Sequence, residues 1–187
     1  MPLPPSPLTV EDVLAGIVRM AAAGDGVDEE EELVAGLRAR IRRVHETLKA
    51  AGAPRPRVAV IEDIDPPLAA GGWVPDQVKR AGGIDVLAAI GAPSVRVAAA
   101  QVRTADPEVV LIAPRGGSLA GAAATGRTLL ARPEWRWLHE RRVWAIESGV
   151  LTVGDGPHLV HGIEVMARIF NAELFTPLDD THAERLA

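Results

Sequence analysis

Three acidic side chains, Glu62, Asp63 and Asp65, follow a short apolar run at residues 58–61. If that run is a strand of an open α/β sheet, its carboxyl end is the edge where ligands bind. Paired carboxylates at such an edge can serve acid–base chemistry or bind a metal ion. A solvated turn has the same composition. No histidine or second carboxylate cluster is tied to these acids by spacing, so both interpretations stay open.

The segment APRGGSLAG, residues 113–121, is a second candidate because it joins a predicted strand to a predicted helix. Glycines at the amino end of a helix can admit a phosphate group. The segment lacks the lysine of a P-loop and the full dinucleotide fingerprint. It is therefore either a phosphate site or a plain strand-to-helix turn.

His158, His161 and Glu164 are spaced by three on the last predicted helix, and Asp155 stands just before it. Imidazole and carboxylate groups in this arrangement can bind zinc, but the same spacing is typical of an ordinary helix surface. The chain has no cysteine, which excludes disulfides and cysteine–zinc sites. No Gly-x-Ser-x-Gly elbow is present either. We therefore predict that the protein is not an enzyme, with a metal site as the weaker alternative.

Tryptophan has an unusual place in this chain, where aromatic residues make up only 3%. Trp73 lies in IEDIDPPLAAGGWVPDQV, behind a glycine pair on a predicted loop. Trp135, Trp137 and Trp144 lie in PEWRWLHERRVWAI. We expect Trp144, inside a strand pattern, to lie in the core, and Trp135 and Trp137 to pack a short helix against the sheet. Trp73 is thus the aromatic side chain that the sequence places beside the acidic strand end.

The charge balance excludes several partners. A net charge of −5 gives no footprint for nucleic acid, and the basic patch Arg136, Arg141 and Arg142 has no stacking platform beside it. No apolar run is long enough to span a bilayer, and the first residues lack the features of a secretory signal. We expect no nucleic acid partner, no membrane insertion and, for the chain as written, a cytoplasmic location.

The first part of the chain predicts helices. Residues 1–8 are rich in proline and suggest a flexible arm, and residues 9–51 a helical extension. Thr9-x-x-Asp12 approximates a capping box at the start of the first helix. A longer helix over 28–51 carries acids in its first turns, bases in its later turns and one apolar stripe, formed by Val34, Leu37, Ile41, Val44 and Leu48. Two heptads are too few to favour a coiled coil over packing against a domain.

Beyond a linker, AGAPRPR at 51–57, short apolar runs alternate with helical patterns. The predicted strands are 58–61, 95–97, 109–113 and 143–146, and the predicted helices are 75–81, 84–90, 98–105, 118–131 and 157–170. This alternation indicates a largely parallel sheet covered on both faces. The predicted fold class is α/β: a single three-layer, Rossmann-like lobe over 55–175 with a long helical amino-terminal extension. We expect the tail, 176–187, to be partly packed and then frayed.

Several motifs occur here in a familiar order: Asp-Pro-Pro, Gly-x-Trp-Val-Pro, Ala-Gly-Gly-x-Asp-Val-Leu, Ala-Asp-Pro-Glu-Val-Val and a final Glu-Leu-Phe. Together they make residues 9–175 resemble the carboxyl-terminal lobe of substrate-binding proteins for cobalamin and iron–siderophore uptake. The likeness is greatest to the cobalamin-binding branch. The resemblance implies two α/β lobes joined by a bridging helix, here 28–51, with ligand clamped between them for delivery to an ABC importer. It also implies that the first lobe and the export signal of this usually extracytoplasmic family are absent from the sequence.

The resemblance also implies a ligand-binding set: Trp73, Glu62, Asp63, Ser94 and Thr152. Trp73 alone matches a family aromatic. Glu62, Asp63 and Ser94 stand where the family often carries aromatic side chains. The loop GVLTVGDGP around Thr152 lacks the aromatic and the arginine that the family often has there.

The position of a family glutamate that docks on the transporter is Ala100 in this chain. One lobe with one tryptophan cannot bury a ligand as large as cobalamin, because such pockets enclose most of the ligand surface. We therefore predict a non-enzymatic lobe for a corrinoid or a siderophore, closed by a separate amino-terminal lobe or by a homodimer. The alternative is a cytoplasmic interaction or regulatory module that reuses the lobe without ligand transport. No cofactor is expected besides such a ligand.

Overall fold

The computed structural model describes residues 8–21, 27–152, 156–175 and 182–187, without the side chains of residues 21, 27 and 152. The strands are β1 (Arg57–Ile64), β2 (Pro67–Ala69), β3 (Ile84–Asp85), β4 (Val95–Arg96), β5 (Val109–Ile112), β6 (Arg142–Ile146) and β7 (Ala183–Arg185). The α-helices are α1 (Val10–Ala21), α2 (Val27–Ala50), α3 (Val74–Arg80), α4 (Ala99–Thr104), α5 (Leu119–Ala131), α6 (Gly149–Thr152) and α7 (Gly156–Phe170). Two 3-10 helices, η1 (Pro133–Glu140) and η2 (Ala172–Leu174), complete the described part of the chain.

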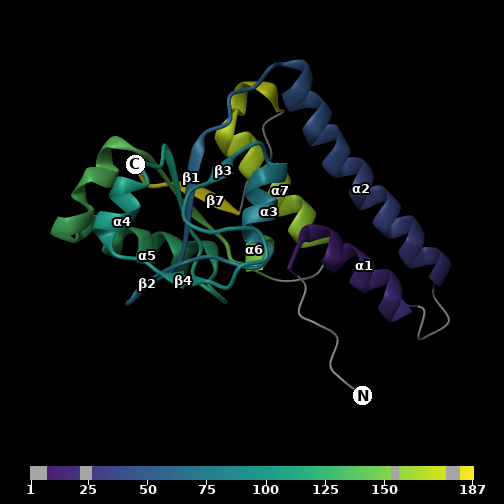
Figure 1. The fold of residues 1–187 in the computed structure, drawn as a ribbon, viewed down its shortest axis with the longest axis horizontal. Helices are drawn as coiled ribbons and strands as arrows, with labels where there is room; N and C mark the ends of the chain where they lie inside the picture. Colours follow the sequence, from purple (N-terminus) through teal and green to yellow (C-terminus); the bar gives the residue numbers. More distant parts are fainter. Residues whose placement is uncertain (1–7, 22–26, 153–155, 176–181) are drawn as a thin grey trace.

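The strands form one sheet in the order β4-β2-β1-β5-β6-β7, and β3 pairs with the amino end of β1. The central pairs β1–β5 and β5–β6 are parallel, as is β1–β3, whereas the outer pairs are antiparallel. Parallel central strands need helical crossovers, and these cover both faces of the sheet (Figure 1). The predicted α/β lobe with three layers is confirmed.

The alternation of side chains along β1 and β5 explains the two covered faces. Val58 and Val60 belong to the core shared with α2, α3 and α7, while Ala59 and Ile61 belong to the core under α4, α5 and η1. All residues of β5 are buried, as expected for a central strand of a parallel sheet. Trp135 is buried in the second core, in agreement with the sequence prediction.

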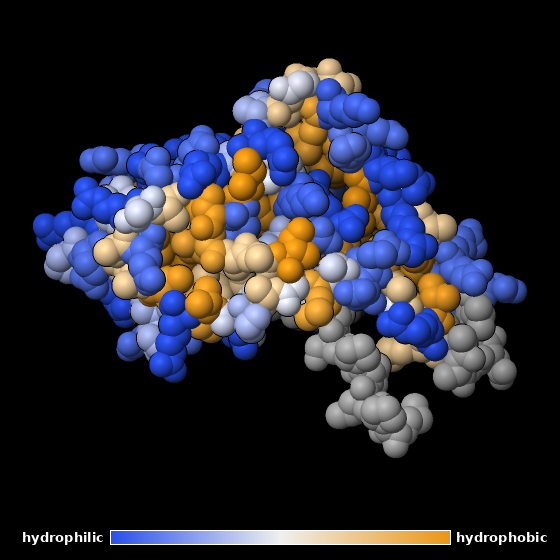
Figure 2. Space-filling model, in the orientation of Figure 1, coloured by the Kyte–Doolittle hydropathy of each residue, from blue (hydrophilic) through white to orange (hydrophobic). Residues whose placement is uncertain are grey.

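The amino-terminal hairpin of α1 and α2 packs against α7 (Figure 1). Its first helix is fixed by the predicted capping box: Asp12 N donates to Thr9 Oγ1 at 3.1 Å, and Thr9 N donates to Asp12 Oδ2 at 3.0 Å. The predicted α2 stripe is buried against the lobe, apart from Leu48, which is partly buried. Hydrophobic residues gather where α2 faces the lobe, and its outer side is hydrophilic (Figure 2). Met20, in the last turn of α1, is 80% exposed.

Two predicted segments differ from the structure. The helix expected over 84–90 is wrong, because the chain forms β3 and then a turn. Asp85 Oδ1 accepts hydrogen bonds from Leu87 N and Ala88 N, each 2.9 Å long, and these local bonds favour a turn over a helix. The expected frayed end is also absent: residues 183–185 form β7, which pairs with β6.

Candidate functional site

Glu62 and Arg115 meet at the carboxyl edge of the parallel strands. Glu62 is the sixth residue of β1, and Arg115 follows β5 by three residues, so the β1–β5 pairing brings both loops to one edge. Arg115 Nη2 donates to Glu62 Oε1 at 2.5 Å, with 4% of the glutamate side chain and 61% of the arginine side chain exposed. The hydrogen bond that Arg115 donates to Glu62 raises the pKa of Arg115. The pair is a buried anion that holds a solvent-facing cation in place.

Ser94 joins this pair and fastens two loops together. Its Oγ accepts a hydrogen bond from Arg115 Nη2 at 3.2 Å and another from Gly71 N at 3.1 Å. A Cβ at Gly71 would come within 2.4 Å of Ser94 N, so only glycine lets these two loops lie this close. Ser94 is therefore a positioning residue for Arg115 as well as part of the loop junction.

Asp63 follows an irregularity in β1, because the pairing with β2 shifts register between Ile61 and Asp63. It is exposed, and its Oδ1 accepts hydrogen bonds from Ile64 N at 2.7 Å and Asp65 N at 3.1 Å. These bonds brace the turn that follows β1. The two acids thus have different hydrogen-bond partners: Glu62 is paired with Arg115, whereas Asp63 accepts bonds from the turn and acts on Arg115 only through its charge.

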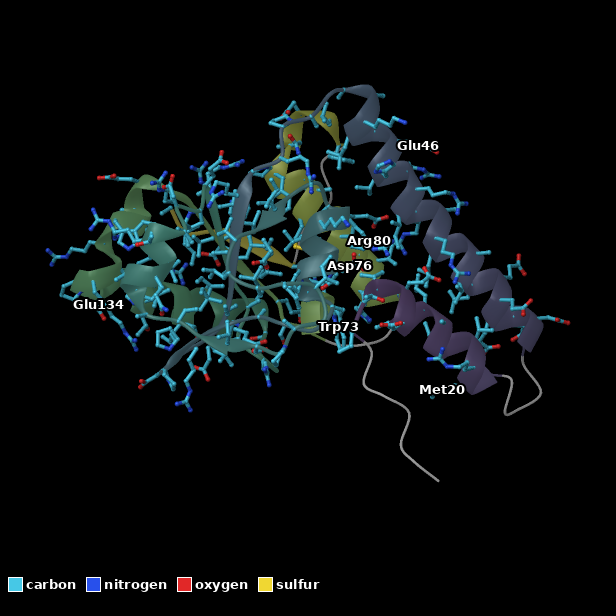
Figure 3. All side chains as sticks on the ribbon, viewed as in Figure 1. Met20, Glu46, Trp73, Asp76, Arg80 and Glu134 are labelled. Carbon is cyan, nitrogen blue, oxygen red and sulfur yellow. The ribbon has the colours of Figure 1, made fainter. Side chains whose placement is uncertain are left out.

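Trp73 lies at the start of α3, beside α6 (Figure 3). It is half-buried against the larger core, and its indole Nε1 donates to the carbonyl of Leu151 at 2.8 Å. Gln77, one turn along α3, donates from Nε2 to the carbonyls of Val150 at 3.1 Å and Leu159 at 3.0 Å. The tryptophan ring is therefore held in one orientation by α6, with part of its surface facing solvent.

Thr152 is the last residue of α6, so its backbone lies beside the Trp73 anchor. Its side chain lies outside the described part of the structure. The loop that leads into α6 is tied to the loop after β5, because Ser148 N and Ser148 Oγ both donate to the carbonyl of Gly117 at 3.1 Å. The predicted phosphate turn, residues 113–121, is thus hydrogen-bonded to the loop after β6.

The predicted metal set does not form around a common point. Arg40 on α2 donates to Glu164 through Nε at 2.9 Å and Nη2 at 2.6 Å, and His161 Nδ1 lies 3.7 Å from the same carboxylate. Burial raises the pKa of Glu164, but the bonds from His161 and Arg40 outweigh it and lower that pKa to about 2. Asp155 lies outside the described residues. In the described ranges, no group of three or more His, Asp or Glu side chains is arranged to hold a metal ion.

The turn before α5 is capped from within. Ser118 Oγ accepts a hydrogen bond from Gly121 N at 3.3 Å, which satisfies one of the free amides of the helix start. The neighbouring Arg115 turns back to Glu62 instead of facing this helix end. Sequence reasoning weighed the glycines of this segment and missed its arginine. The available signal was a charged residue directly after a buried strand, at the same edge as Glu62.

No helix among the described residues combines the length and the apolar character needed to cross a bilayer.

Comparison with known proteins identifies the architecture. No family model matches the sequence, and no curated protein matches it. The structure of an ABC transporter substrate-binding protein from Listeria monocytogenes EGD-e is similar with a TM-score of 0.77 and 16% identity, over 89% of this chain and 66% of that one. A periplasmic heme-binding protein from Pseudomonas aeruginosa is similar with a TM-score of 0.73 and 20% identity, over 96% and 66%. A periplasmic vitamin B12-binding protein from Vibrio cholerae is similar with a TM-score of 0.67 and 16% identity, over 89% of this chain and 63% of that one.

These likenesses agree with the resemblance drawn from the sequence motifs. In the three comparisons the chain spans 63% to 66% of the other protein's length, so it corresponds to a part of each. The chain therefore has the fold of ABC transporter substrate-binding proteins, over less than the full length of those proteins.

Proposed function

We propose that this chain is a non-enzymatic, cobalamin-type solute-binding lobe, whose ligand is a corrinoid or a related metal chelate held at the carboxyl edge of the sheet. The observation that carries the proposal is the fixed, solvent-facing guanidinium of Arg115, held by Glu62 and Ser94. Arginine presents several N–H donors in a planar fork that suits carboxylate and phosphate oxygens. Cobalamin bears a phosphate and several amides around an apolar ring, and both features need complementary groups.

Trp73 supports an apolar contact at the same edge. It stands two residues after Gly71, whose amide is bonded to Ser94, so the tryptophan and the Glu62–Arg115 pair belong to connected loops. Its ring is fixed by the bond to Leu151, and it faces a ligand without a large loss of side-chain freedom. Asp63 and Thr152 complete the proposed ligand set, Asp63 through its exposed carboxylate in β1 and Thr152 through its place at the end of α6.

Closure of the site requires a second surface. Pockets for large ligands bury most of the ligand, and one sheet edge covers only one side of it. We propose that a separate amino-terminal lobe or a second copy of this chain supplies the other wall, with α2 acting as the bridging helix.

Titration of the purified chain with cyanocobalamin, and separately with hemin, tests the proposal through tryptophan fluorescence and light scattering. We expect quenching by cyanocobalamin that is largely lost in Trp73→Phe and weakened at least about tenfold in Arg115→Met. Trp137→Phe is the matched control, because Trp137 packs in the core on the other side of the sheet. Quenching that is equal in Trp73→Phe and the parent chain, or no binding of either ligand by monomer or dimer, contradicts the proposal. Binding of hemin without binding of cyanocobalamin would reject a corrinoid as the ligand and support another metal chelate.

A second candidate function is an interaction or regulatory module without ligand transport. It is favoured because polar groups at this edge already have hydrogen-bond partners within the chain: Glu62 pairs with Arg115, and the Trp73 indole donates to Leu151. Ile90 and Val95, beside the Ser94 loop, are also exposed and apolar. A stable homodimer with no affinity for cyanocobalamin or hemin is the result expected of this module.

A further inference from the structure

A pocket of about 320 Å³ lies between the carboxyl ends of α2 and α3, away from the proposed ligand edge. Part of its lining is the linker that precedes β1, including Arg55, and another part is Gly82, just before β3. Because β1 and β3 are parallel and begin here, the pocket lies at the amino-terminal end of the sheet. We call it the basic pocket, after its charged lining residues: His45, Lys49, Arg55, Lys79 and Arg80.

The basic pocket contains both lysines of the protein. The chain has 20 cationic side chains of the Lys or Arg type, and only Lys49 and Lys79 among them are lysines. They come from the last turns of two helices that are separate in sequence, and the fold brings them to one pocket. Lysine is a compact, flexible point charge and a common ligand of phosphate groups.

The positive charge of the pocket is only partly compensated. Arg80 Nε donates to Asp76 Oδ2 at 3.0 Å, and Arg55 Nη2 donates to the carbonyl of Gly83 at 3.0 Å. Among the described residues, no hydrogen bond or ion pair involves the side-chain ammonium group of Lys49 or Lys79.

No carboxylate of the described residues lines the pocket. Figure 3 shows Glu46 on the outer side of α2, away from α3, whereas Asp76 and Arg80 lie on α3. A concave site lined by one sign of charge concentrates the potential and attracts counter-ions. The unpartnered cations stand on a protein with a net charge of −5, so the basic pocket is a local feature and not a consequence of overall basicity.

Helix dipoles explain part of this pattern. Cations in the last turn of a helix stabilise it through the helix dipole. That role accounts for Lys49 on α2 and for Lys79 and Arg80 on α3. It does not account for Arg55, which lies in the linker, or for the hollow that all of these side chains share.

We propose that the basic pocket binds a multiply charged phosphate, with Lys49 and Lys79 as its principal ligands and Arg55 and Arg80 as supporting cations. The volume is within the range of small-molecule sites, about 300–1,000 Å³, and exceeds what a single small ion requires. The phosphate groups belong either to a soluble compound or to a lipid headgroup. This site is independent of the proposed corrinoid function, because it lies at the opposite end of the parallel strands.

The scarcity of lysine gives a direct test. Reductive methylation with isotope-labelled formaldehyde places NMR probes on Lys49, Lys79 and the terminal amine, and it retains their charges. Lys49→Arg and Lys79→Arg assign the signals. We expect inorganic pyrophosphate to shift both lysine signals with one saturation curve and to leave the terminal amine unchanged, against sodium chloride of equal ionic strength.

Calorimetry on unlabelled variants supplies a second measurement. We expect Lys49→Ala combined with Lys79→Ala to weaken pyrophosphate binding at least about tenfold, because each lost charge-assisted contact costs affinity. Arg103→Ala is the matched control: Arg103 is an exposed cation in the last turn of α4, outside the pocket, and its loss changes only a helix dipole. Unchanged lysine signals on addition of pyrophosphate overturn the proposal, as does equal affinity of the double variant and the parent chain.

Vesicles of phosphatidylglycerol in phosphatidylcholine identify the source of the phosphate. Pyrophosphate binding without sedimentation on these vesicles supports a soluble phosphate. Pyrophosphate binding together with sedimentation that Lys49→Ala and Lys79→Ala abolish supports a lipid headgroup. Sedimentation that is equal in the double variant, with no response to pyrophosphate, contradicts the site.

Discussion

The two ends of the parallel strands use charge in opposite ways. At the carboxyl end, Glu62 and Arg115 are paired, and Ser94 accepts a further bond from the same guanidinium. At the amino end, Lys49 and Lys79 share a pocket with no ionic partner among the described residues. A paired charge fixes the position of a side chain, whereas an unpartnered charge retains its attraction for a ligand. The carboxyl end therefore holds a charged side chain in a fixed position, and the amino end provides a positive electrostatic potential.

The largest expected effect concerns the close packing of α6 against α7 beneath Trp73. A Cβ at Gly162 on α7 would lie 1.9 Å from the carbonyl oxygen of Val150 on α6, which is backbone and cannot move aside alone. We expect Gly162→Ala to destabilise the protein by more than about 3 kcal/mol and to release the Trp73–Leu151 anchor. Urea denaturation and tryptophan emission measure the two effects.

Gly36→Ala on α2 is the matched control, because a Cβ there meets nothing within 4 Å. Alanine at this exposed helical position is expected to stabilise the protein by up to about 1 kcal/mol. Equal stability changes in the two variants would contradict close packing at Gly162.

In the ion pair at the carboxyl end, Glu62 is buried and Arg115 is exposed, so the two partners are expected to differ in the cost of their removal. Arg115→Met leaves the buried Glu62 carboxylate without its cation, and we expect a loss of about 2–3 kcal/mol, reduced from a fully buried pair because the guanidinium faces water. Glu62→Gln keeps an acceptor for Arg115 and is expected to cost about 1 kcal/mol or less. Denaturant midpoints compare the variants.

The comparison of these two variants provides the control for this prediction. Equal losses of stability in Arg115→Met and Glu62→Gln would show that the buried carboxylate without its cation is not the cause.

At the amino end, Asp85 is the acid whose charge the fold disfavours. Burial raises its pKa from 3.8 to about 6, against the hydrogen bonds from Ala88 N and Leu87 N. This raised pKa contributes stability below a pH of about 4 that is lost as the pH rises through about 6. Asn cannot ionise but keeps the acceptor, so Asp85→Asn is expected to stabilise the protein by about 1–2 kcal/mol at neutral pH.

Thermal unfolding of both proteins at a series of pH values checks this expectation. The gain of Asp85→Asn is expected to disappear as the pH falls through the interval from about 6 to about 4, where the parent carboxyl also becomes neutral. A gain of equal size at every pH would contradict the role of ionisation.

The loop junction at the carboxyl end is expected to give the smallest effect. Ser94→Ala leaves the amide of the buried Gly71 without its partner and removes one acceptor from Arg115. We expect a loss of about 1 kcal/mol in stability, typical of one hydrogen bond. Ser118→Gly is a suitable control, because it changes only the cap of α5 and is expected to cost a few tenths of a kcal/mol.

Local patterns in the sequence predicted much of the fold. The apolar runs gave β1, β5 and β6, the capping box gave the start of α1, and the apolar stripe gave the buried side of α2. The turn after β3 was missed because its cause is a side chain bonded to its own backbone, which propensity does not register. The edge carrying Glu62 was found, but its partner Arg115 was not, because the two are 53 residues apart.

The sequence by itself determined the alternation of strands and helices, the covered sheet and the absence of cysteine chemistry, because hydrophobic period and composition are local properties. Only the tertiary structure decided which charges meet. Lys49 and Lys79 occupy separate helices, and Glu62 and Arg115 follow separate strands. Whether a charge is neutralised or left available depends on distance in space, which the crossovers of the parallel sheet set and the residue order does not.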